Sequence, residues 1–147
     1  MAYQVADIAN KIIKMVPEAD NSAGELVSNM KLQKLLYYQQ GFHLAYFGTS
    51  LFDEEIEAWM YGPVVPSMYK KYKTKGSKGL VYEGDTISLT SEEESLFNEV
   101  IRVYGEFSAI GLKNLTHSES PWKETPVGVG KVISKDKMMK FFKKKLK

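Results

Sequence analysis

The segment from Lys31 to Lys73 constrains the fold of this 147-residue chain more than any other part of it. It joins a helical run, a short alternating run, a Gly-Pro pair and a second helix start without a long linker. Most of the aromatic residues of the chain fall inside it. This pattern predicts a compact, mainly helical domain of the α+β class, and it favours a surface that binds a macromolecule over catalytic machinery.

The length and composition narrow the class of protein. A chain of 147 residues is typical of one domain, so we expect residues 1–147 to form a single domain with a basic C-terminal helix at about 134–147. The sequence has no cysteine, which excludes disulfides and thiolate metal sites. No secretory segment and no run of about 18 apolar residues is present. We therefore predict a cytoplasmic protein without membrane contact and without a cofactor.

Four regions repeat apolar residues at helical spacing: residues 3–16, 31–47, 91–105 and 134–147. Ser28 or Asn29 is expected to cap the second helix, and Gly48 to end it. Pro66 is suited to the first position of another helix.

The C-terminal half predicts further local features. Ser91 and Glu94 have the spacing of a capping box ahead of the helix at 91–105. Ser108 is expected to start a short helix that carries Ile110, Leu112 and Leu115, and residues 116–125 have the pattern of a turn region.

Two short runs have the alternating pattern of strands. Ile56, Ala58 and Met60 alternate with polar or aromatic residues, and Ile87 and Leu89 alternate in a second run. We expect residues 56–60 and 85–89 to pair as a small antiparallel β element, with Gly62-Pro63 as a turn.

Several exposed groups are candidates for partner contact. Strand alternation places Trp59 and Tyr61 opposite the apolar face of their run, and such amphipathic aromatics are enriched in interface hot spots. Together with nearby polar groups of the following helix, they give the candidate set Trp59, Tyr61, Tyr69, Lys70 and Lys73.

Two alternatives belong to other classes. A small hydrolase or metal-dependent enzyme would use His43 and His117 with nearby acids, but no metal-binding, nucleophile or phosphate-binding motif is present. Nucleic-acid binding would use the tail, where residues 131–147 hold eight lysines against one acid, Asp136. Arg102 is the sole arginine, and base readout favours arginine, so nucleic acid is not the expected partner.

Three motifs carry a family resemblance. The runs KLQKLLYY at residues 31–38 and EAWMYGPVVP at 57–66, followed by Thr116-His117 and Pro121-Trp122, resemble the Panacea-domain family of SocA- and GepA-like antitoxins. The resemblance implies a phage-associated toxin–antitoxin protein that is not an enzyme and binds a cognate protein toxin, encoded by an adjacent gene. In a variant of this mechanism the toxin is delivered to a ClpXP-type protease.

The resemblance also assigns residues. The motif positions expected to preserve the scaffold are Lys31, Gln33, Lys34, Tyr37, Tyr38, Gly41, Gly62, Pro63, Pro66, His117, Pro121 and Trp122. Specificity for one toxin is then expected in the loop at 73–84, the outer face of 92–105 and the basic tail.

Overall fold

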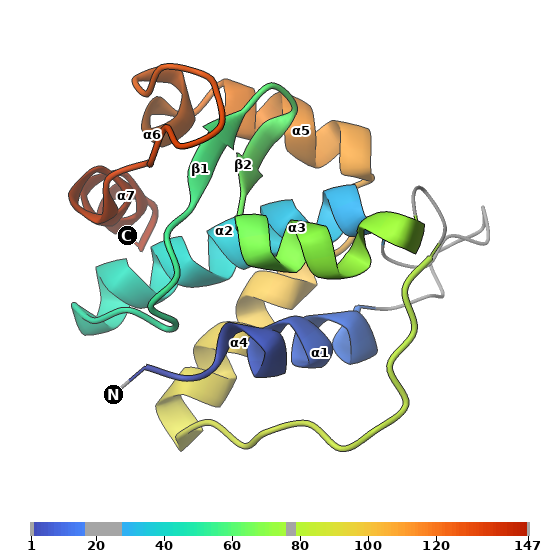
Figure 1. Cartoon of the computed structure of the whole chain (residues 1–147). Coiled ribbons are helices and arrows are strands. Elements are labelled where there is room, and N and C mark those ends of the chain that lie inside the picture. The colour runs from blue at the N-terminus through green and yellow to red at the C-terminus, as the bar shows by residue number, and fades with distance from the viewer. Residues whose placement is uncertain (1, 17–27, 76–78, 147) are drawn as a thin grey trace.

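A helix that runs through the middle of the molecule organises the fold (Figure 1). The computed structural model describes residues 2–16, 28–75 and 79–146. Within these ranges the helices are α1 (Val5–Met15), α2 (Asn29–Phe47), α3 (Pro66–Tyr72), α4 (Ser91–Tyr104), α5 (Ala109–His117), α6 (Ser120–Lys123) and α7 (Lys135–Lys143), and the strands are β1 (Glu57–Trp59) and β2 (Gly62–Val64). Short 3-10 turns follow α3 and α7. The mainly helical α+β class is confirmed.

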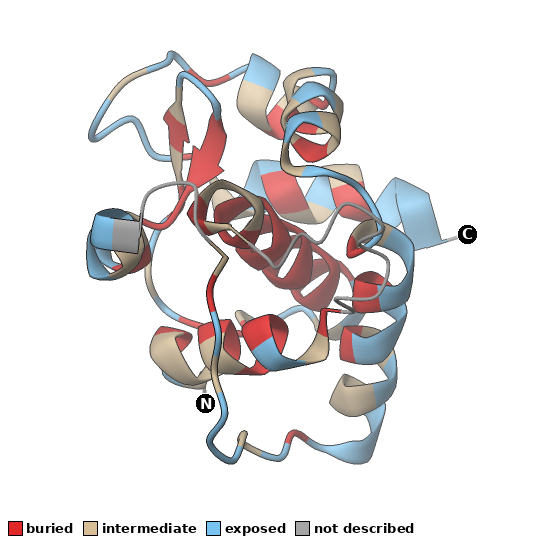
Figure 2. Cartoon of the chain, turned by 90° about the vertical axis from the view of Figure 1, so that its right-hand side faces the viewer, coloured by how far each residue is buried: buried red, intermediate tan, exposed pale blue. Residues whose placement is uncertain are grey.

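The central helix, α2, is buried on all of its sides rather than on one face (Figure 2). Its polar side chains bond to the backbone of neighbouring segments: Gln40 accepts from Leu51 N at 2.7 Å and donates to Phe52 O at 2.8 Å. Buried polar groups are stable when they are paired in this way. The predicted caps are confirmed, because Ser28 Oγ accepts from the Lys31 backbone N–H and Gly48 has a left-handed φ of 76°.

The last helix closes the core against α2. The ring of Phe142 lies 5.4 Å from Tyr37 and 4.7 Å from Phe42, measured between ring centroids. Gly41 allows this approach, because a Cβ atom added at Gly41 would lie 2.2 Å from the Phe142 ring. The sequence pattern of residues 31–47 places Tyr46 on the same face as Phe42, but Tyr46 is 58% exposed.

The β element is a hairpin, and only one of its two predicted strands is correct. β1 pairs antiparallel with β2, so that Trp59 lies opposite Gly62 and Met60 and Tyr61 form the turn. The predicted pairing with residues 85–89 is wrong.

Residues 85–89 are extended, but they bond to side chains rather than to a strand. Lys11 Nζ donates to Ile87 O at 2.9 Å, and Leu89 N donates to Glu94 Oε2 at 3.0 Å. The alternation of Ile87 and Leu89 therefore belongs to an extended segment that lies against α1 and α4, not to a strand.

The first residues of α4, α5 and α7 are set by side chains that cap the helix N-termini. α4 is capped by Thr90 and Glu93, one residue before the predicted box. Ser108 and Ser134 cap α5 and α7. The predicted turn region at 116–125 holds the end of α5 and the short helix α6. Residues 21–24 have the composition of a loop, but they lie outside the described residues, and a single domain over 1–147 stays a prediction.

Candidate partner-binding site

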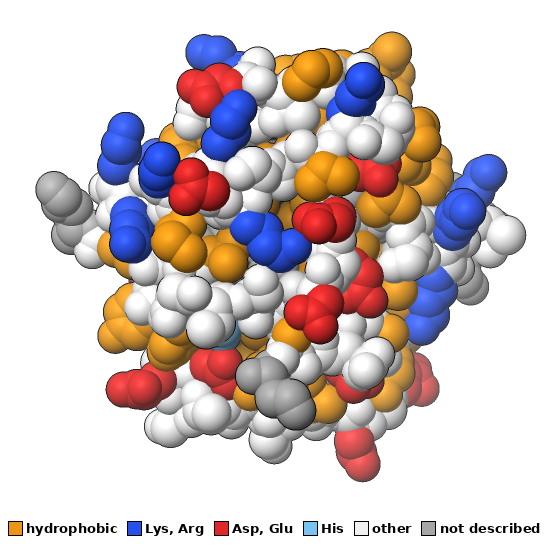
Figure 3. All heavy atoms as spheres, turned by 60° about the vertical axis from the view of Figure 1, so that its left-hand side comes forward, with side chains coloured by type: hydrophobic (Ala, Val, Ile, Leu, Met, Phe, Trp, Pro, Cys, Tyr) orange, Lys and Arg blue, Asp and Glu red, His pale blue; other side chains and the backbone are white. Residues whose placement is uncertain are grey.

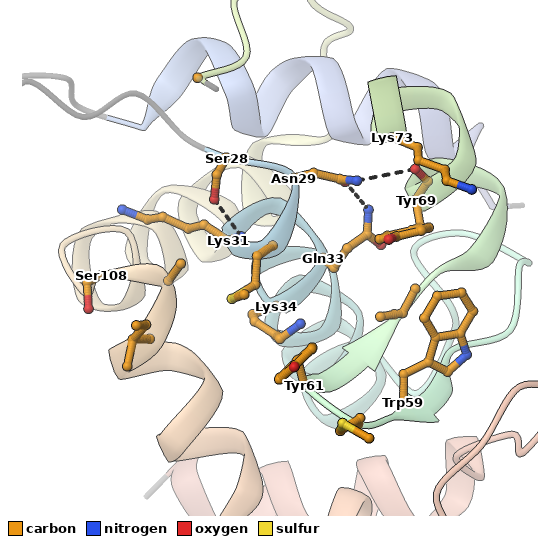
Figure 4. Close-up of a pocket in the computed structure, with 16 residues that line it drawn as sticks. Ser28, Asn29, Lys31, Gln33, Lys34, Trp59, Tyr61, Tyr69, Lys73 and Ser108 are labelled. Carbon is orange, nitrogen blue, oxygen red and sulfur yellow. Dashed lines mark hydrogen bonds between the residues drawn. The ribbon is translucent and has the colours of Figure 1, made fainter. Parts of the chain in front are cut away.

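A pocket of about 950 Å³ opens between the start of α2, the β hairpin, α3 and the start of α5 (Figure 4). It gathers four of the five residues predicted to contact a partner: Trp59, Tyr61, Tyr69 and Lys73. Lys70 is exposed on α3 and is not among the lining residues. The pocket also contains motif residues of α2, so part of the signature stretch and most of the contact candidates share one site.

Aromatic and apolar side chains form the wall and rim of the pocket. The rings of Trp59 and Tyr69 meet edge to face, with centroids 5.1 Å apart. Met60, Tyr61 and Ile110 are 66%, 56% and 62% exposed. α5 buries Leu112 and turns Ile110 toward the rim. Exposed large apolar groups that adjoin a pocket are characteristic of interaction sites.

Lys34 lies at the inner wall of the pocket and is only 1% exposed. Its Nζ donates to Pro63 O at 3.4 Å, and its aliphatic chain lies against Gly62. Burial lowers the pKa of Lys34 to about 7. Lysine is rarely buried without a partner. Sequence patterns do not indicate this burial, because it arises only when the hairpin folds over α2.

The pocket is basic. Of the described residues that line it, Lys31, Lys34 and Lys73 are cationic and none is acidic. Lys31 Nζ also donates to Gly105 O at 2.7 Å, at the C-terminal end of α4. A cation is favourable at that end of a helix.

The two histidines lie in separate surroundings. His43 Nε2 is 2.7 Å from Glu93 Oε2, and its Nδ1 is 2.7 Å from Thr49 O. His117 stacks on Trp122 with ring centroids 3.8 Å apart. Burial, with the charges of Lys113 and Lys34, lowers the pKa of His117. The enzyme alternative needs both histidines in one cleft, and the described residues hold no group of three or more side chains suited to a metal ion.

A buried acid joins two of the sequence motifs. Tyr37 and Tyr38 on α2 donate to the two carboxylate oxygens of Glu119, at 3.0 Å and 2.8 Å. Burial raises the pKa of Glu119 to about 7, against the opposing effect of these hydrogen bonds. In the sequence Glu119 was only one of several acids near a histidine, since nothing local indicates its tyrosine partners.

Most other motif residues hold elements together. Gln33 Oε1 accepts from Val65 N at 2.9 Å, and Trp122 Nε1 donates to Trp59 O at 2.9 Å. Pro66 begins α3, and Pro121 is buried at the start of α6. These contacts support a scaffold role for the motif, while Lys31, Gln33 and Lys34 are motif residues that also line the pocket.

The lysines of the C-terminal helix are partly paired with acids. Lys135 Nζ lies 2.9 Å from Glu55 Oε1, and Lys140 Nζ lies 3.1 Å from Asp136 Oδ2. Basic and acidic side chains are interspersed on the face of the molecule seen in Figure 3. A phosphate backbone favours an unbroken basic patch, and this face does not present one.

Comparison with known proteins shows the family to which the chain belongs. The chain belongs to the family described as antitoxin SocA-like, Panacea domain, whose model matches residues 32–123. It is similar to antitoxin SocA of Caulobacter vibrioides (strain NA1000 / CB15N), with 31% identity over 117 residues, or 71% of this chain and 62% of that protein. The chain thus spans less than two thirds of that relative's length. No solved structure matches the chain significantly. None of the described helices is both long and apolar enough to cross a membrane.

Proposed function

We propose that this protein is a cytoplasmic antitoxin that neutralises a protein toxin, encoded by an adjacent gene, by binding it directly and without chemistry of its own. The observation that carries the proposal is the pocket, in a chain of the antitoxin family, whose rim exposes Met60, Tyr61 and Ile110. A few residues in well-packed recesses, aromatic ones prominent among them, supply most of the binding energy in protein interfaces. The toxin is held inactive while its segment occupies the pocket.

The pocket is suited to a protein segment in its size and shape. A volume of about 950 Å³ exceeds what one side chain fills and accommodates a few residues of a partner. The walls come from α2 itself and from two helices, α3 and α5, and a hairpin that pack on it, so the recess is largely preformed. A preformed recess lowers the ordering cost of association.

The test is co-expression of the chain with the product of the adjacent gene. Wild-type protein should restore growth and co-purify with the toxin. Ile110→Asp should weaken both effects at least tenfold, because it places a charge in the apolar rim. Val129→Asp is the matched control, because Val129 is 81% exposed and is not among the residues that line the pocket. Absence of rescue and of co-purification by the wild-type chain would refute the proposal.

Delivery of the toxin to a ClpXP-type protease is the nearest variant of this function. It also requires binding, so the half-life of the toxin separates the two. An adaptor shortens the half-life of the toxin only in cells that contain the protease, whereas simple neutralisation leaves it unchanged or longer in both strains.

A further inference from the structure

The buried amine of Lys34 is the least satisfied charged group of the pocket. An ammonium has three N–H donors. Among the described residues the structure gives this one a single long hydrogen bond, to Pro63 O at 3.4 Å, and no carboxylate. Burying a cation without an anion is costly, and the low pKa of Lys34 reflects that cost. An arriving anion would supply the missing partner.

The surroundings of Lys34 indicate the chemistry of that anion. Lys31 and Lys73 lie on opposite sides of the pocket, and its described lining has no acid, so the recess attracts negative charge (Figure 4). Trp59 and Tyr69 form an apolar wall of the same pocket. A carboxylate carried next to an apolar side chain matches both features.

A phosphate is a poorer match for this pocket. Phosphate sites commonly use the bidentate fork of arginine. The sole arginine of the chain, Arg102, lies on α4 and pairs with Glu99 at its own surface. The cations of the pocket are single-point lysine donors, which suit one carboxylate.

We propose that the pocket binds an acidic segment of the partner toxin, with one carboxylate paired to Lys34 Nζ and the neighbouring apolar side chain against Trp59 and Tyr69. The proposal rests on the proposed antitoxin function and names the recognition chemistry of the same site. Lys34 is then both a scaffold residue of the motif and the charge that selects the segment.

The test measures affinity by calorimetry between the purified chain and the toxin encoded beside it. Lys34→Met keeps the length of the side chain and removes the charge, and a thermal unfolding scan checks that it folds. We expect Lys34→Met to lose at least tenfold in affinity. Lys123→Met, which removes an exposed lysine of α6 outside the pocket, should bind like wild type.

A scan of the toxin identifies the carboxylate. Each aspartate and glutamate of the toxin is changed to its amide. One of these substitutions should lower the affinity for the wild-type chain at least tenfold, and it should change the affinity for Lys34→Met only a little. That coupling isolates the pair. Unchanged binding by folded Lys34→Met, or no coupled carboxylate in the toxin, overturns the inference.

The outcomes also separate the two proposals. If wild-type protein and Lys34→Met bind and neutralise the toxin equally, the antitoxin function stands and the role of Lys34 is wrong. If the wild-type chain does not bind the toxin at all, both fall. Binding of isovalerate at millimolar concentration, without any coupled toxin residue, would assign the pocket to a small carboxylic acid and overturn the inference as well.

Discussion

Replacing Glu119 by glutamine should make the protein more stable at neutral and alkaline pH. Glu119 is 4% exposed, and burial raises its pKa from an ordinary 4.5 to about 7. A carboxyl with a raised folded pKa favours folding in its protonated form. Its contribution is fully present below pH 4.5 and is lost as the pH rises through 7.

The size of the effect follows from the two pKa values. A shift from 4.5 to about 7 corresponds to about 3 kcal/mol in the free energy of unfolding. Most of it, about 2.5 kcal/mol, falls between pH 5 and pH 8. Glutamine stays neutral, and its amide can still bond to the hydroxyls of Tyr37 and Tyr38. Glu119→Gln should therefore lack this loss of stability.

Urea denaturation at pH 5 and pH 8, followed by circular dichroism, measures the difference. The free energy of unfolding of Glu119→Gln relative to wild type should be about 2–3 kcal/mol higher at pH 8 than at pH 5. Glu106→Gln, an exposed carboxylate after α4, serves as the control and should follow wild type. Parallel pH profiles for wild type and Glu119→Gln would show that the buried carboxyl does not titrate as reasoned.

Three further predictions concern other buried contacts. Gly41→Ala should lower the free energy of unfolding by about 1–3 kcal/mol in urea denaturation, because its Cβ meets the Phe142 ring, and Phe142→Leu should relieve part of that cost. Gln40→Leu should cost about 2–4 kcal/mol and lower the thermal midpoint, because it leaves a buried N–H and a buried carbonyl unpaired. Burial alone would raise the pKa of Glu93, but hydrogen bonds from Tyr3, His43 and Thr90 lower it to about 2. The contribution of Glu93 to stability is therefore present above pH 4.5 and is lost as the pH falls toward 2. Unfolding curves for Glu93→Gln should lack this acid-dependent loss of stability.

Local features of the fold were predictable from the sequence. Ser28 and Gly48 were among the predicted caps, and the predicted helix starts at Ser108 and near residue 134 were correct, because a cap depends on hydrogen bonds within three or four residues. Non-local pairing was not predictable. Ile87 has the pattern of a strand, but its carbonyl accepts from Lys11, which lies 76 residues earlier in the chain.

The candidate site was predictable in part. Trp59 and Tyr61 stood out because strand alternation placed them away from the core, and the structure puts both at the pocket. Lys34 and Ile110 could not be assigned this way. The periodicity of a helix shows which residues share a face, but it does not show that a hairpin will bury a lysine or that a rim will expose an isoleucine.

The position of α7 has a consequence for how the protein is made. The core around α2 is closed by Phe142, which is synthesised about a hundred residues after the helix that it covers. Domains fold as units once their parts have emerged from the ribosome. During translation the rings of Tyr37 and Phe42 therefore remain without their last partner, and a messenger cut short before α7 would yield a chain that cannot complete its core.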